Sequence, residues 1–164
     1  MLHRVTILEF ERGLQLRNGR IVRVLAPGTH WVLGRVERAD LRLRSVEVDA
    51  GGVRTREEIP VGVAARITYR LTDPAAAFVR VRSVAAQLQA DARAAIVRTM
   101  ASAVVGALAR EHLRLEQQVQ DRLSLDAHAY GTRVEDVAIL PIRYPRALRR
   151  RWKQGEAPRV EMGL

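Results

Sequence analysis

The sequence predicts an α+β fold in which an N-terminal antiparallel β-meander is followed by helices and a closing strand. Between residues 59 and 71 the odd positions are apolar or aromatic, a period of two that indicates a strand with one buried face. Asp73 and Pro74 then have the composition of a helix start, and Gly131 separates a helical pattern from an extended run at 132–140. The predicted order is therefore strands, helices, strand.

The turn signals of the meander lie in the first thirty residues. Asn18-Gly19 separates the short runs 14–16 and 21–22, and this dipeptide is typical of a two-residue β-hairpin. Gly13 and Gly28 are further candidate corners, where glycine reaches positive φ without steric cost. We expect a small set of antiparallel strands from this segment.

A change of phase in the hydrophobic pattern precedes the long strand. Leu41 and Leu43 alternate in one phase, whereas Val46 and Val48 alternate in the other. An extra residue in one strand would return both pairs to the same face of a sheet. We therefore expect a β-bulge near Ser45.

The helical half begins at Asp73, which can cap a helix that has Pro74 at its first position. Ser83 can cap a longer helix, whose apolar positions recur at spacings of three and four: Val84, Leu88, Ala92, Ala95, Ile96, Met100 and Val104. A further helix has the same kind of stripe, formed by Leu115, Val119, Leu123, Ala127 and Tyr130. Gly131 ends that helix in a left-handed conformation.

The composition argues against several kinds of chemistry. The chain has no cysteine, and its four histidines, among them His30 and His112, are not spaced as metal ligands or as partners of a nucleophile. No apolar run approaches the roughly 20 residues that span a bilayer. We expect no enzymatic activity, no cofactor and no metal site.

Four short motifs carry a family resemblance. They are Arg54-Thr55-Arg56-Glu57 before the alternating strand, Tyr69-Arg70-Leu71-Thr72-Asp73-Pro74 at its end, Tyr130-Gly131-Thr132-Arg133-Val134, and Val137-Ala138-Ile139-Leu140-Pro141. In this order and spacing the chain resembles the SPFH, or band 7, domain of stomatins, prohibitins and flotillins. The resemblance implies a domain over 1–145, with a β-rich lobe at about 1–72 and a helical lobe with a closing strand at about 73–145. A basic tail would follow at 146–164.

The departures from the family pattern indicate a divergent member. Glu57 stands where the family usually has aspartate, and residues 109–125 lack the usual threonine-leucine-aspartate run. We also expect the chain to lack the N-terminal membrane anchor and the C-terminal coiled coil of many relatives.

The resemblance implies a non-enzymatic scaffold or protein-interaction module that associates with itself or with partner proteins. Unpaired strand edges would supply the contact, and residues 5–10 are the segment expected to provide one. In many relatives such a module acts at a membrane surface, so we expect a cytoplasmic protein peripheral to the inner face of the membrane.

An alternative function follows from the charge of the carboxy-terminal segment. The formal net charge is +10, and no acidic residue lies between Ile142 and Gly155. Tyr144 lies in the same stretch, beside the candidate anion-binding residues, which are Arg143, Arg146, Arg149, Arg150, Arg151, Trp152 and Lys153. Basic residues next to an aromatic ring favour an anionic lipid surface. Nucleic acid is a weaker alternative, because no recognition helix or stacking platform accompanies the segment.

Overall fold

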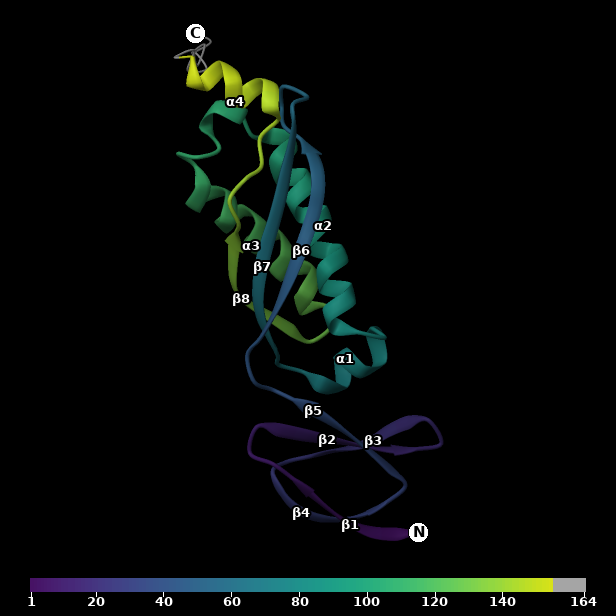
Figure 1. Ribbon diagram of the computed structural model, residues 1–164. Coiled ribbons are helices and arrows are strands. Elements are labelled where there is room, and N and C mark those ends of the chain that lie inside the picture. Colours follow the sequence, from purple (N-terminus) through teal and green to yellow (C-terminus); the bar gives the residue numbers. More distant parts are fainter. Residues whose placement is uncertain (155–164) are drawn as a thin grey trace.

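The computed structural model describes residues 1–154 and has two lobes joined end to end (Figure 1). The N-terminal lobe consists of β1 (Leu2–Ile7), β2 (Glu11–Arg17), β3 (Arg20–Leu25), β4 (Gly28–Leu33) and β5 (Arg35–Asp40). The second lobe has the strands β6 (Arg44–Arg54), β7 (Pro60–Leu71) and β8 (Thr132–Ile139). Its helices are α1 (Pro74–Arg80), α2 (Val84–Ser102), η1 (Val105–Ala107), α3 (His112–His128) and α4 (Arg146–Lys153).

The strands of the N-terminal lobe pair across the sequence as well as along it. β1 pairs with β4, and β2 lies between β3 and β5, with every pair antiparallel. Ile7, Leu25 and Val32 form the small core of this lobe. The predicted antiparallel strands are confirmed, while the pairing of β1 with β4 follows from no signal in the sequence.

The turn at Asn18-Gly19 is confirmed, because both residues have positive φ angles, of 52° and 75°, between β2 and β3. The expectation for Gly13 is wrong. This glycine lies inside β2, where an added Cβ would stand 2.8 Å from Cδ1 of Ile7. The position needs glycine because the small core packs against the strand there, and not because of its φ angle.

The predicted bulge near Ser45 is also wrong. Leu43 is exposed in the connection between the lobes, and β6 runs in regular register from its first residue. The irregularity occurs instead between Asp49 and Gly51, where the Asp49 carboxylate accepts a hydrogen bond of 2.8 Å from the Gly51 N–H. Gly51 has a φ of 70°, so this bulge uses the conformational freedom of glycine.

The alternating strand is confirmed as β7, the central strand of the sheet β6-β7-β8. Val63, Ala65 and Ile67 on its odd positions are fully buried, and α2 and α3 cover this face (Figure 1). The core takes residues from strands that precede Asp73 and from helices that follow it. The domain limits at 145 and 146 stay predictions.

The helix starts follow the expected chemistry. The Asp73 carboxylate accepts a hydrogen bond from the Ala76 N–H at 3.1 Å, and Ser83 Oγ accepts one from the Ala86 N–H at 3.3 Å. Gly131 has a φ of 62° directly before β8. The α+β fold with helices between the strands and a closing strand is thereby confirmed.

Candidate functional site

The basic segment forms the short helix α4, which lies at the opposite end of the molecule from β1 and β4 (Figure 1). Its positively charged residues at spacings of three and four fall on one side of the helix and line a shallow hollow of about 300 Å³: Arg146, Arg149, Arg150 and Lys153. All four side chains are exposed. The structure therefore brings four of the seven predicted anion-binding residues to one surface.

Arg143 does not join this surface. It precedes α4 and continues the edge of the sheet, exchanging backbone hydrogen bonds of 2.8 and 2.9 Å with Gly62. Its guanidinium pairs with the Asp49 carboxylate at 3.0 Å. The pKa of Asp49 lies below its ordinary value, first because of the Gly51 N–H and then because of this guanidinium. Arg143 thus has an acidic partner within the fold.

Trp152 and Arg151 also lie outside the four-residue stripe. The Trp152 ring contacts the Tyr144 ring edge-on, with 4.9 Å between the centroids, and both residues are only partly exposed. Arg151 is five positions from Arg146, which places it about 140° around the helix axis. The sequence analysis did not separate these residues from the other four, because no capping residue predicts a helix in this segment. The spacing of the four basic residues, by three and four positions, is the signal that could have indicated it.

The outward face of the β1–β4 sheet carries an apolar group. Leu2 is paired with Leu33 across the two strands, and Arg4 is paired with Trp31. Trp31 is 65% exposed, and the two leucines are 57% and 44% exposed. Among residues 1–154, each of the two strands has one edge without a strand partner. The predicted edge segment 5–10 includes the end of β1 and the turn into β2.

The edges of the large sheet are partly covered by side chains from the helices. On β6, Gln89 of α2 donates a hydrogen bond of 3.0 Å to the Glu47 carbonyl. On β8, Gln120 of α3 donates one of 3.2 Å to the Glu135 carbonyl, and the Ile139 N–H donates to Glu116 at 2.8 Å. Such caps reduce the tendency of an edge strand to pair with another chain.

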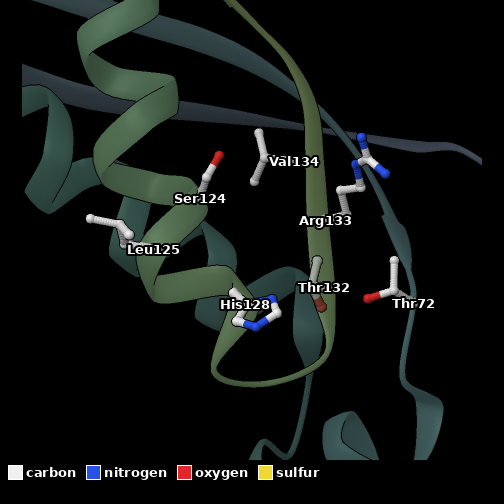
Figure 2. Close-up of a pocket in the computed structure, with 7 residues that line it drawn as sticks. All are labelled: Thr72, Ser124, Leu125, His128, Thr132, Arg133 and Val134. Atoms are coloured by element: carbon white, nitrogen blue, oxygen red, sulfur yellow. The ribbon is translucent and has the colours of Figure 1, made fainter.

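A groove of about 660 Å³ lies between the last turns of α3 and the start of β8 (Figure 2). It is lined by Thr72, Ser124, Leu125, His128, Thr132, Arg133 and Val134. Leu125 is 79% exposed, whereas Thr132 and Val134 are buried and form the floor. No motif in the sequence indicated this groove, because its residues come from separate elements.

Two of the four histidines, His30 and His112, have contacts within the fold. The His30 ring lies 2.7 Å from the Ala26 carbonyl, and the His112 ring lies 3.1 Å from the Glu116 carboxylate. Within residues 1–154 there is no group of three or more side chains that could hold a metal ion. No helix in the same part of the chain combines the length and hydropathy needed to cross a membrane.

These features define an α+β domain with a small antiparallel lobe and a three-stranded sheet covered on one face by two helices. The chain belongs to the SPFH domain / Band 7 family, whose model matches residues 5–161.

Three relatives place the chain within this family. A stomatin homolog of Pyrococcus abyssi is 27% identical over an alignment of 157 residues that covers 93% of this chain and 59% of that protein. Stomatin-3 of Caenorhabditis elegans is 28% identical, over 87% of this chain and 55% of that protein. A Band 7 protein of Drosophila melanogaster is 26% identical, over 88% of this chain and 30% of that protein. The chain thus spans about half the length of several relatives that it matches.

Proposed function

We propose that this chain is a non-enzymatic scaffold module that associates with copies of itself through its N-terminal lobe. Family membership supports a scaffold or protein-interaction role. The observation that favours this lobe is the combination of an unpaired β1 edge with the exposed face formed by Leu2, Trp31 and Leu33. An unpaired edge offers backbone hydrogen bonds, and the apolar face offers surface that association removes from water.

The large sheet is the weaker route for self-association. Side chains of α2 and α3 already form hydrogen bonds to backbone groups on the outer edges of β6 and β8.

In the proposal, the module works in the cytoplasm beside a membrane surface. The proposal assigns no catalytic role to any residue.

Light scattering coupled to size-exclusion chromatography tests the proposal. We expect the mass of the wild-type chain to rise above that of a monomer as its concentration increases. The double variant Trp31→Lys/Leu33→Lys should remain monomeric, because it places two charges on the apolar face. Leu113→Lys is the matched control, since Leu113 is an 80% exposed leucine on α3. A wild-type chain that stays monomeric at every concentration contradicts the proposal.

A second candidate function is binding to an anionic lipid surface through α4. The supporting observation is the common exposed face of Arg146, Arg149, Arg150 and Lys153. Each basic residue close to an anionic membrane contributes about 1 kcal/mol. Neutralising three of them should weaken partitioning by roughly 3 kcal/mol, on the order of a hundredfold.

Vesicle flotation separates this candidate from nonspecific attraction by net charge. The triple variant Arg146→Gln/Arg149→Gln/Arg150→Gln should lose flotation with vesicles that contain phosphatidylserine. The control variant is Arg17→Gln/Arg20→Gln/Arg23→Gln, which removes the same number of positive charges from the β2–β3 hairpin. It should float with these vesicles as the wild type does. Equal loss in both variants, or equal flotation with neutral vesicles, argues against an α4 site.

A further inference from the structure

The two halves of the outer edge of β8 differ in how they are covered. In the C-terminal half of β8, the Gln120 side chain donates a hydrogen bond to the Glu135 carbonyl, and the Glu116 carboxylate accepts one from the Ile139 N–H. At the other half, the neighbouring α3 side chains with polar groups are Ser124 and His128. Within residues 1–154 these two side chains make no hydrogen bond.

The register of the sheet determines which backbone groups face the groove. The Gly131 carbonyl accepts a hydrogen bond of 2.8 Å from the Thr72 N–H, so Gly131 and, two residues later, Arg133 direct their backbone groups toward β7. Thr132 and Val134 direct theirs away from β7. Both residues form the floor of the 660 Å³ groove, with Ser124 on its α3 wall (Figure 2).

The groove also carries a positive charge that the fold does not fully neutralise. The Arg133 side chain is 64% exposed, and its Nε lies 3.6 Å from Glu135 Oε1. The same oxygen lies 2.7 Å from Nε of Arg70, which is its closer partner. None of the described residues that line the groove is acidic. A ligand with a carboxylate beside Arg133 would complement this charge.

We propose that the groove binds a short extended peptide segment of a partner protein, which adds to the outer edge of β8 at Thr132 and Val134. This inference rests on the proposed role of the chain as a protein-interaction module. Successive side chains of an added strand point to opposite faces of the sheet. Those beside Thr132 and Val134 would lie on the side of the sheet covered by α3, where Ser124 and Leu125 line the groove, and should be apolar. The residue between them would lie beside Arg133 and should be acidic. The recognised pattern is apolar-acidic-apolar.

Strand addition obtains affinity from main-chain hydrogen bonds and specificity from alternate side chains. Because the caps at Glu135 and Ile139 limit the free edge, the peptide can pair with only a few residues. The side chain of Leu125 offers the largest exposed apolar contact in the groove. We therefore expect a weak complex that depends strongly on this leucine.

Fluorescence anisotropy with three labelled pentapeptides tests the inference on the full chain. The first peptide alternates valine and glutamate, the second alternates valine and lysine, and the third is the first with its central backbone nitrogen methylated. We expect the glutamate peptide to bind and the other two to bind at least about tenfold more weakly, a difference of 1.4 kcal/mol. Equal binding of the methylated peptide would overturn strand addition, and equal binding of the lysine peptide would overturn the role of Arg133.

Variants locate the binding site. Leu125→Glu should weaken binding of the glutamate peptide by about tenfold or more, as truncation of a central apolar anchor commonly does. Leu113→Glu is the control, because Leu113 is an equally exposed leucine on the same helix outside the groove. Arg133→Glu should reverse the preference between the glutamate and lysine peptides. If Leu125→Glu binds as the wild type does, the groove is not the site.

The outcome of this experiment is independent of self-association. Light scattering measures the mass of the chain, and comparison with the Trp31→Lys/Leu33→Lys variant tests contacts of the N-terminal lobe. The peptides test the edge of β8 instead. A chain that self-associates and binds none of the three peptides contradicts this inference alone. A monomeric chain that binds the glutamate peptide through Leu125 contradicts only the proposed self-association.

Discussion

Gly131 and Asp73 are in direct backbone contact although 57 residues separate them in the chain. The Gly131 carbonyl accepts a hydrogen bond of 3.0 Å from the Asp73 N–H, and a Cβ at Gly131 would collide with the Asp73 carbonyl oxygen. The turn that ends α3 is therefore packed against the residue that caps α1. One contact ties the end of β7, the start of the helices and the start of β8 together.

Replacing Gly131 should destabilise the protein more than replacing another glycine of the same conformation. Gly131→Ala combines a left-handed φ of 62° with a collision against backbone, so we expect a loss of at least about 2 kcal/mol in the free energy of unfolding. Gly19→Ala is the control, because its φ is 75° and open space surrounds it. Its cost should be about 1 kcal/mol. Urea denaturation measures both, and equal losses would contradict the importance of the Asp73 contact.

Truncation in the middle of β7 should affect the whole second lobe. Ile67 is fully buried between α2 and α3 and the sheet, so Ile67→Ala should lower the free energy of unfolding by about 2–5 kcal/mol. Val97→Ala removes methyl groups from a 44% exposed residue on α2 and should cost about 0.5 kcal/mol or less. Thermal or urea unfolding followed by circular dichroism gives both values. A small loss at Ile67 would contradict its place in the core.

The Glu116 carboxylate should stabilise the edge of β8. Glu116→Ala leaves the partly buried Ile139 N–H without its acceptor and should cost about 1–3 kcal/mol. Glu116→Gln keeps an oxygen that can accept this hydrogen bond, and should recover most of the stability. Hydrogen exchange at the Ile139 amide measures the local effect. Unchanged protection of this amide in Glu116→Ala would show that the contact has no energetic role.

Acid should weaken the connection between the lobes. The Arg42 guanidinium holds the pKa of the Asp40 carboxyl well below its ordinary value of 3.8, with Arg42 Nη2 2.7 Å from Oδ2 of Asp40. Because the folded-state pKa is depressed, the unfolded chain takes up the proton first as the pH falls. The stabilisation is therefore present above pH 3.8 and is lost below it.

The Asp40→Asn variant tests this dependence. Its melting temperature should change less than that of the wild type between about pH 6 and pH 3, because it lacks the titrating carboxyl. High salt should reduce the difference between the two chains at neutral pH, since the pair is close to solvent. Identical pH profiles would contradict a role for the ion pair in stability.

The candidate interaction surfaces were predicted only in part. The composition of the C-terminal segment identified its positive charge, but not that Arg146 and Lys153 share one face while Arg143 pairs with Asp49. That pairing joins residues 94 positions apart, and no local pattern indicates it. The groove at Leu125 and Val134 was missed for the same reason. Whether the basic residues bind anything stays a prediction.

The sequence by itself determined the elements whose causes are local. The alternation along β7, the caps at Asp73 and Ser83, and the glycine stop at Gly131 depend on backbone preferences and on side chains a few residues away. Only the tertiary structure decided that β1 pairs with β4, that Gly13 packs against Ile7, and which strand edges are covered. These features depend on contacts between distant segments, and such contacts form only when the whole chain packs.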